Sequence, residues 1–341
     1  MRTCEFAEFN PRSARALSGF FNRVPRFLLD TYSPEMESLI RQAVRNTRFD
    51  LVIASQLSMA TYFEAFRGIP AVMEEAELAM YQPVEDKTLG SLGAFRRQLT
   101  WTKHRRYLGD LLKNFRLCTV ASEPERILVA EAALSTIPIH VIPNFVDAEH
   151  YRPMAETRAA NTLVFTGSLK FSPNHDAVSW FVEEIFPLVQ SKVPEVQLTV
   201  TGDTGNVAKR EAPGVIYSGR VDDVRTVMAA SAVSVVPIRQ GGGTRLKILE
   251  ALAMGTPLVT TSKGVEGIEA RHGEHVLIAD TAAAFAEATV RLLRDPVYAQ
   301  QLADAGRRLV QSAYDSGSVL PSFLRLLEEA ACPAAAEALV G

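Results

Sequence analysis

The sequence predicts an α/β fold with two domains. Short apolar runs alternate along the chain with amphipathic stretches of helical period, and this alternation is typical of helices that cover a parallel sheet. With 341 residues, of which 47% are hydrophobic and 22% charged, the chain can bury two domain cores of ordinary size. The composition is that of a folded globular protein.

The predicted strands form two groups with a polar segment between them. The first group is residues 51–54, 71–73, 117–121 and 140–142, and the second is residues 163–166, 196–201, 215–217, 233–236 and 258–260. Residues 144–153 and the polar stretch 154–161 predict a linker, so we expect an N-terminal domain over 1–153 and a C-terminal domain over 154–315. Residues 316–331 predict a final helix that packs back on the N-terminal domain, and the Ala-rich tail to residue 341 should fray.

A strongly basic helix is predicted over residues 95–116. Trp101, Leu108, Leu112 and Phe115 share one face. Its cations are Arg96, Arg97, Lys103, Arg105, Arg106, Lys113 and Arg116, against the one acid Asp110. Such a helix can rest on anionic lipid, which predicts peripheral contact with the inner membrane surface. The alternative is a solvated basic face over a buried apolar stripe.

Charge and cysteine usage exclude several classes of protein. A formal charge of -3 and a pI near 6.1 argue against a nucleic-acid partner, which a basic surface would attract. Cys4, Cys118 and Cys332 are too far apart in sequence for a zinc set or a disulfide framework, and His272 and His275 lack a third ligand nearby. We expect no metal site. The sequence also has no apolar run near the roughly 20 residues of a membrane span and no signal-peptide core, which predicts a cytoplasmic location.

A glycine-rich loop after the strand 233–236 is the most informative segment. Gly241, Gly242 and Gly243 let the backbone approach a ligand closely, and Thr244 is expected to cap a helix whose first amides attract anions. The cations Arg245 and Lys247 lie in the first turn, where the helix dipole disfavours them unless an anion compensates. The carboxylate of Glu250, on the same side of the helix, can accept hydrogen bonds from sugar hydroxyls. The loop therefore predicts a phosphate site; the alternative is a tight loop beside an ordinary Lys247–Glu250 ion pair.

This loop resembles the donor-binding signature of family 4 (group 1) glycosyltransferases, in the branch that carries GGGTRLK. Further stretches agree, and the resemblance covers nearly all of residues 115–315. They are IPNFVD at 142–147, which is similar to the family's hinge element, VFTGS at 164–168, YSGRVDD at 217–223 and KGVEGI at 263–268. The resemblance implies a GT-B fold, with two Rossmann-like domains facing across a cleft. It also implies transfer of a hexose-type sugar from a UDP-, GDP- or ADP-sugar to a glycan, lipid-linked or small-molecule acceptor, with retained configuration and no metal or other cofactor.

The resemblance also implies roles for individual residues. Glu250 would bind the ribose, while Arg245 and Lys247 would neutralise the diphosphate and serve catalysis, because transfer loads negative charge onto the departing group. The remaining donor-site residues would be Gly167 at the turn opening the donor domain, Gly241, Gly242, Gly243, Thr244, Arg220, and the backbone of Gly264, Val265, Glu266 and Gly267. On the acceptor side, Gln56 follows one strand and Glu75 follows the next, at the end where α/β enzymes bind ligands; an exposed loop acid is the equal alternative for Glu75.

The chain departs from the family pattern in several places. Gly242 stands where the wider family has the first Glu of its EX7E motif. Many family members carry an Arg and a Lys after the turn at Gly167, but here only Lys170 follows it. Gln56 lies where the family has a histidine in the N-terminal domain. A first β-α-β unit, roughly 30 residues or more, is missing, so the N-terminal domain is expected to be incomplete. Either the start is assigned too late, or the chain is a degenerate relative. Two other functions therefore stay open: a non-catalytic nucleotide-sugar binder, and a GT-B-fold sugar-nucleotide epimerase.

Overall fold

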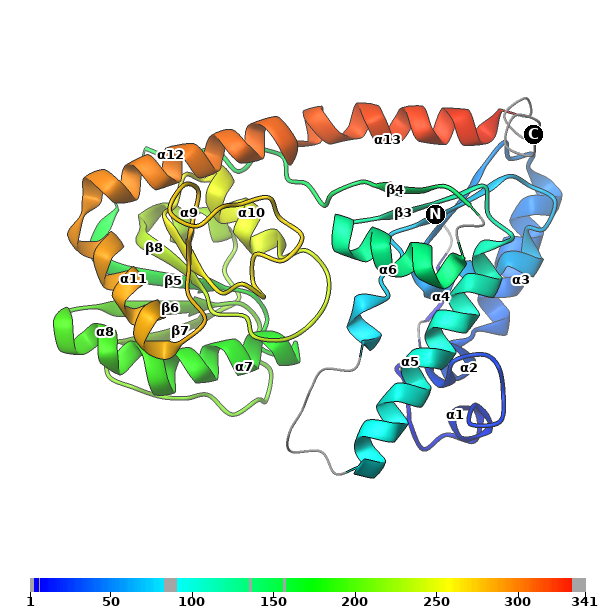
Figure 1. Cartoon of the computed structure of the whole chain (residues 1–341), viewed down its shortest axis with the longest axis horizontal. Helices are drawn as coiled ribbons and strands as arrows, with labels where there is room; N and C mark the ends of the chain where they lie inside the picture. Colours follow the sequence, from blue (N-terminus) through cyan, green and yellow to red (C-terminus); the bar gives the residue numbers. More distant parts are fainter. Residues whose placement is uncertain (1–2, 6, 83–90, 135–136, 156–157, 333–341) are drawn as a thin grey trace. The chain divides into compact units, whose positions relative to one another are not determined.

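The chain divides into two compact units, each with its own parallel sheet. The computed structural model describes residues 3–5, 7–82, 91–134, 137–155 and 158–332 (Figure 1). Unit 1 comprises Met1–Pro143 and Ser322–Gly341, and unit 2 comprises Asn144–Pro321.

Unit 1 carries a parallel sheet of four described strands in the order β1-β2-β3-β4. The strands are β1 (Val52–Ser55), β2 (Ala71–Glu74), β3 (Leu117–Val120) and β4 (Ile139–Val141). Its helices are α1 (Ala14–Ser18), α2 (Arg26–Thr31), α3 (Pro34–Asn46), α4 (Gln56–Ala60), α5 (Ser91–Leu112) and α6 (Glu123–Ala133). These strands match the first predicted group within one residue at each end, because short apolar runs of strand length mark them in the sequence.

Successive residues of these strands face opposite sides of the sheet. Met73 and Cys118 pack into the main core of the unit, where Leu108 of α5 is also buried. Their neighbours Val72 and Leu117 pack with Ala330, near the end of the final helix. That helix, α13 (Ser316–Ala331), therefore covers the second face of the sheet in unit 1.

The apolar stripe of the basic helix lies in the core. Leu108, Leu112 and Phe115 are buried and Trp101 is half-buried against the same cluster. Of the two interpretations of this stripe, the buried one is confirmed, and the stripe is not available to insert into a lipid layer.

Unit 2 carries a six-stranded parallel sheet in the order β10-β9-β8-β5-β6-β7. Its strands are β5 (Ala159–Thr166), β6 (Gln197–Thr201), β7 (Val215–Gly219), β8 (Ser231–Val236), β9 (Leu258–Thr260) and β10 (Leu277–Ile278). Its helices are α7 (Ser172–Trp180), α8 (Phe186–Lys192), α9 (Val224–Ala230), α10 (Leu246–Ala253), α11 (Ala282–Arg294) and α12 (Pro296–Ala313). Figure 1 shows α7 and α8 on one side of this sheet and α9 and α10 on the other. The sequence predicted five of these strands. It did not predict β10, because a strand of two residues is too short to show an alternation of apolar and polar side chains.

The division between the units falls after Pro143 rather than after residue 153 as predicted. The segment that follows Pro143 is tied into unit 2, because the N–H of Val146 donates to the carbonyl of Tyr314 and the Val146 carbonyl accepts from Ser316. The polar linker predicted over 154–161 is also shorter, since β5 begins at Ala159. Residues 156–157 of that linker, and the tail 333–341 that was expected to fray, lie outside the described residues.

Candidate functional site

The loops of interest in unit 2 all leave the same edge of its sheet. Gly167 follows β5, the glycine loop follows β8, residues 264–267 follow β9, and Arg220 follows β7. The strand order reverses between β5 and β8, since the chain proceeds from β5 to β6 on one side and returns to β8 on the other. In open parallel sheets this switch point at the carboxyl edge is where ligands bind.

The side chain of Arg245 hydrogen-bonds to the backbone of the glycine loop. Its guanidinium donates to the carbonyl oxygen of Gly242 at 2.6 Å and to that of Gly241 at 2.8 Å, and only 9% of the residue is exposed. Gly241 and Gly243 have φ angles of 100° and 74°, a region that favours glycine. The loop is therefore held in a fixed shape with a cation behind its carbonyls.

Thr244 does not cap the helix, contrary to the prediction. Arg245 is the N-cap residue and α10 begins at Leu246, so the helix starts one residue too late for Thr244 to reach its first amides. The hydroxyl oxygen of Thr244 is buried and makes no hydrogen bond within the described part of the chain.

Lys247 reaches from α10 to the turn after β5. Its Nζ donates to Oδ1 of Asn174 at 2.8 Å and lies 4.2 Å from the ring centroid of Phe165. Burial of the amine lowers the pKa of Lys247 to about 7, an effect that the Glu250 carboxylate partly opposes and the charge of Arg245 reinforces. An anion placed beside an amine with a pKa near 7 raises that pKa and favours the protonated form.

Gly167 leaves the space that this amine occupies. Its φ angle is 137°, and a Cβ atom there would lie 2.5 Å from Nζ of Lys247 and 2.8 Å from Nδ2 of Asn174. Asn174 is fixed in turn, because its Nδ2 donates to the carbonyl of Ser168 at 2.8 Å. The structure thus brings Gly167, Asn174 and Lys247 into one cluster.

Glu250 has a partner that the sequence did not reveal. The hydroxyl of Tyr151 donates to Oε1 of Glu250 at 3.1 Å. Burial raises the pKa of the Glu250 carboxyl, while the bond from Tyr151 and the charge of Lys247 lower it. Burial and the nearby carboxylate raise the pKa of Tyr151 to about 12. Lys247 and Glu250 therefore each hydrogen-bond to a different residue rather than forming the ordinary helix ion pair of the alternative interpretation.

The loop after β9 uses some of its own amides. The N–H of Gly264 donates to the hydroxyl of Thr261 and that of Val265 to the Thr261 carbonyl. The amides of Gly264 and Val265 are therefore not available to a ligand, and Glu266 and Gly267 stay as the candidates for presenting backbone amides. Only glycine fits at 264, since a Cβ atom there would lie 2.1 Å from Oγ1 of Thr260.

Arg220 is exposed at its predicted place, directly after β7. The strand β7 is at the edge of the sheet, separated from the switch-point strands β5 and β8 by β6. The structure therefore does not bring Arg220 into the cluster of Gly167, Asn174 and Lys247.

The acceptor-side candidates lie together in unit 1. Gln56 and Glu75 directly follow Ser55 and Glu74, which are paired in the register of β1 with β2. Both candidates have left-handed backbones, with φ of 65° and 54°. Non-glycine residues in this region carry strain, which clusters at functional sites.

Asn174 and Tyr151 are the residues that sequence reasoning missed. Asn174 was visible as a polar residue in the segment after the Gly167 turn, where only Lys170 was considered. Lys170 instead forms an exposed ion pair with Asp203. Tyr151 lay in the segment assigned to the linker, and nothing in its spacing linked it to Glu250.

Residues 160–295 match the family model of group 1 glycosyl transferases. Among curated relatives, the chain is 27% identical over 203 residues to a phosphatidyl-myo-inositol mannosyltransferase of Mycobacterium leprae, covering 56% of this chain and 53% of the relative. It is 28% identical over 232 residues to an MMP alpha-(1->4)-mannosyltransferase of Mycolicibacterium hassiacum, covering 64% and 55%. The chain thus spans about half the length of the curated relatives it matches.

Solved structures show that the fold is of the GT-B class. Sucrose-phosphate synthase from Thermosynechococcus elongatus superimposes with a TM-score of 0.70 at 16% identity, covering 87% of this chain and 77% of that one. The Anabaena protein HepE, solved in complex with UDP and glucose, gives a TM-score of 0.64 at 13% identity, covering 86% and 81%.

The described ranges contain neither a metal-ligating cluster nor a helix that could span a membrane. No group of three or more metal-ligating side chains occurs there. No described helix is long and apolar enough to cross a membrane.

Proposed function

We propose that this chain is a glycosyltransferase that moves a hexose-type sugar from a nucleotide-diphosphate donor to a glycan, lipid-linked or small-molecule acceptor. The donor is a UDP-, GDP- or ADP-sugar, the anomeric configuration is retained, and no metal is needed. The observation that carries the proposal is the cluster of Gly167, Asn174 and Lys247 at the switch point of the unit 2 sheet. The family match over residues 160–295 supports it.

In this proposal the diphosphate binds where the amine of Lys247 and the glycine loop meet. Breaking the bond between the anomeric carbon and the departing oxygen places negative charge on the diphosphate. Lys247, with a pKa of about 7 in the absence of ligand, becomes fully protonated as that charge approaches and stabilises the leaving group most in the transition state. Arg245 maintains the loop, and the Glu250 carboxylate, oriented by Tyr151, accepts hydrogen bonds from the ribose hydroxyls.

On the acceptor side, we place the attacking hydroxyl near the edge of unit 1 where Gln56 and Glu75 lie. Their neighbouring positions and strained backbones support this assignment. The relatives named as mannosyltransferases and the neighbours solved with UDP support a nucleotide-sugar donor.

The test is incubation of the whole chain with UDP-, GDP- and ADP-hexoses and a mixture of sugar and lipid-linked acceptors, in the presence of a chelator. Release of one nucleoside diphosphate together with an α-linked product is expected. The Lys247→Met variant should lose most of this activity, whereas the matched control Lys192→Met, at an exposed lysine of the same unit, should keep it.

The other outcomes separate the competing functions. Conversion of the donor to an epimer, without transfer, would replace the proposal with an epimerase. Binding of a nucleotide sugar with no turnover for any acceptor would favour the non-catalytic binder.

A further inference from the structure

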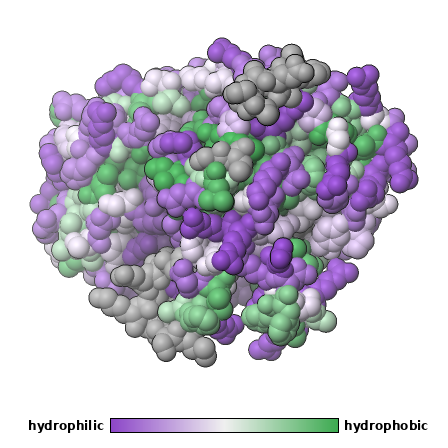
Figure 2. Space-filling model, turned by 45° about the vertical axis from the view of Figure 1, so that its right-hand side comes forward, coloured by the Kyte–Doolittle hydropathy of each residue, from purple (hydrophilic) through white to green (hydrophobic). Residues whose placement is uncertain are grey.

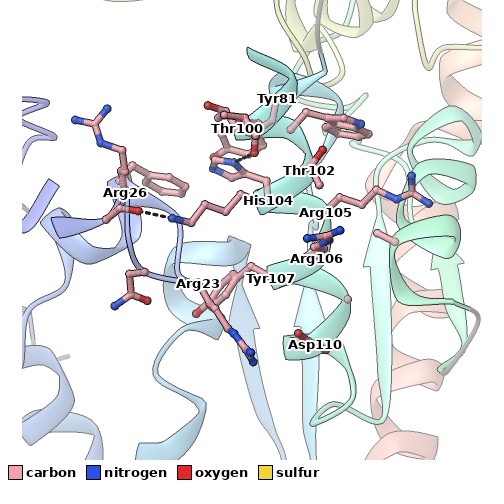
Figure 3. A pocket seen from close by; sticks show the side chains of 18 of the residues that line it. Arg23, Arg26, Tyr81, Thr100, Thr102, His104, Arg105, Arg106, Tyr107 and Asp110 are labelled. Carbon is pink, nitrogen blue, oxygen red and sulfur yellow. Dashed lines mark hydrogen bonds between the residues drawn. The ribbon is translucent and has the colours of Figure 1, made fainter. Parts of the chain in front are cut away.

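A second candidate site lies wholly within unit 1. A groove with a volume of about 1170 Å³ runs between helix α5 and the segment from Phe9 to Phe27, and reaches the end of α6 at Leu134. Figure 3 shows Arg105 and Arg106 on the α5 side of this groove and Arg23 and Arg26 on the facing segment.

The groove concentrates positive charge in a chain that is acidic overall. Its lining includes seven cationic side chains and two acidic ones, Asp110 and Glu131, although the whole chain has a net charge of -3. The cations are Arg23, Arg26, Arg96, Lys103, Arg105, Arg106 and Lys113. Asp110 is paired with Lys113 at 2.7 Å. This imbalance favours an anionic partner.

Two of these cations hold the groove together. The guanidinium of Arg26 donates to the carbonyls of Ala16 and Pro11, and the amine of Lys103 donates to the carbonyl of Gly19. Burial, with a smaller effect of Arg26, lowers the pKa of Lys103. The N-terminal segment is thereby fastened to α5, and Arg23, Arg96 and Arg106 are the exposed arginines of the lining.

Large apolar side chains are exposed beside this charge. Phe20 and Leu99 are each 54% exposed in the groove lining, and Phe21, the next residue along the chain, is 96% exposed. The guanidinium of Arg26 lies 4.0 Å from the centroid of the Phe20 ring. Figure 2 shows apolar surface at the lower edge of the molecule next to strongly hydrophilic side chains. Clustered exposed apolar residues indicate a binding surface rather than ordinary surface composition.

We propose that this groove and its apolar rim bind the surface of an anionic phospholipid bilayer. The arginines contact headgroup phosphates, and Phe20, Phe21 and Leu99 enter the boundary between headgroups and acyl chains. The contact differs from that of an amphipathic helix lying in the membrane, because the apolar stripe of α5 is buried. A soluble acidic glycan or free phosphate would satisfy the cations but leave Phe21 in water, which is why the lipid source is favoured. The proposal stands independently of sugar transfer.

The test is co-sedimentation of the whole chain with vesicles of phosphatidylcholine alone or with phosphatidylglycerol added. Binding to the anionic vesicles, weakened by salt, is expected. Because basic residues are attracted to an anionic surface, the double variant Arg23→Glu, Arg106→Glu should bind at least roughly tenfold more weakly. The double variant Phe20→Ser, Phe21→Ser should lose the binding that survives at high salt.

Matched controls are Arg48→Glu and Phe49→Ser, at exposed positions of unit 1 outside the groove lining. Both should bind like the unchanged chain, and circular dichroism should show every variant folded. Failure of the folded chain to bind anionic vesicles, or equal losses in groove and control variants, would overturn the proposal. Tight binding of heparin that is indifferent to the Phe20 and Phe21 changes, without vesicle binding, would replace the bilayer with an acidic glycan.

Discussion

At the scale of single residues, Lys247 and Glu250 of the proposed donor site each hydrogen-bond to a residue far away in the sequence. The sequence singles out Lys247 because a cation in the first turn of a helix is unfavourable without an anion, and Glu250 because it lies on the same side of the helix. Their partners could not be predicted, since Asn174 lies 73 positions from Lys247 and Tyr151 lies 99 positions from Glu250. Local spacing carries no information about contacts that only the folded sheet creates.

The space at Gly167 gives a first prediction. Gly167→Ala should lower the free energy of unfolding by about 1–3 kcal/mol, because the new side chain is held in a strained backbone region. It should also displace Lys247 and weaken nucleotide binding at least roughly tenfold, the effect of losing a charged hydrogen bond. Thermal unfolding and nucleotide titration measure the two effects.

Gly219→Ala is the matched control for this substitution. Gly219 also has a positive φ, of 70°, yet a Cβ atom there meets nothing within 4 Å. Gly219→Ala should therefore lower the free energy of unfolding without changing the affinity for nucleotide. Equal losses of affinity in both variants would show that strain, rather than the position of the Lys247 amine, explains the result.

The pKa of Lys247 predicts how stability depends on pH. The folded value, about 7, is below the ordinary value of 10.5, so between these limits the unfolded chain holds a proton that the folded chain lacks. Stability therefore rises with pH across this window, and the contribution is lost as pH falls through 7. Lys247→Met should reduce the rise, as denaturant titrations at several pH values would show; an unchanged slope would contradict the assignment.

The same lysine predicts proton uptake when a nucleotide diphosphate binds. The anion restores the charge of the amine, so at pH 8 binding should take up a fraction of a proton and weaken as pH rises further. Calorimetry in two buffers of different ionisation enthalpy measures the uptake. Heats that do not depend on the buffer would count against a neutral Lys247 in the ligand-free chain.

At the scale of elements, the strands were predictable and their limits less so. Runs such as 163–166 and 233–236 are mostly apolar and buried at every residue, because both faces of a parallel sheet are covered. Thr244 was expected to cap α10, but Arg245 is the N-cap residue, and its side chain donates to carbonyls of the loop, a contact that helix-capping preferences do not predict. The domain division was misplaced because Val146 bonds across to Tyr314 and Ser316, which composition does not indicate.

The end of α13 gives an element-scale prediction. Arg116, directly before β3, donates to the carbonyls of Ala330 and Cys332 at 2.6 and 2.8 Å. Arg116→Ala should lower the free energy of local opening of this helix end by about 1.5–3 kcal/mol, the usual value for hydrogen bonds to a charged group. Amide hydrogen exchange of residues 326–332 should accelerate accordingly.

Arg126→Ala is the comparison variant, because the side chain of Arg126 forms an exposed pair with Glu123 on α6. It should leave exchange at residues 326–332 unchanged. Protection that persists in Arg116→Ala would mean that the packing of Ala330 alone holds the helix end in place.

At the scale of the whole molecule, the two units carry different chemistry. Unit 2 assembles a cationic, glycine-lined site at its switch point, and unit 1 carries a basic groove with an apolar rim. The fold class could be predicted because the alternation of apolar and amphipathic runs is a local signal, and the glycine-rich turn that carries the proposed donor site is local too. The groove could not be predicted, since its apolar and cationic side chains come both from the N-terminal segment and from α5, and only tertiary structure joins them.

The most direct test of the donor site is isothermal titration of the whole chain with UDP, GDP and ADP. One nucleotide should bind, and Asn174→Ala and Lys247→Met should each weaken that binding by about 1–3 kcal/mol while Lys192→Met leaves it unchanged. Absence of binding by the folded chain, or equal affinity in all three variants, would contradict the assignment of the Gly167, Asn174 and Lys247 cluster as the diphosphate site.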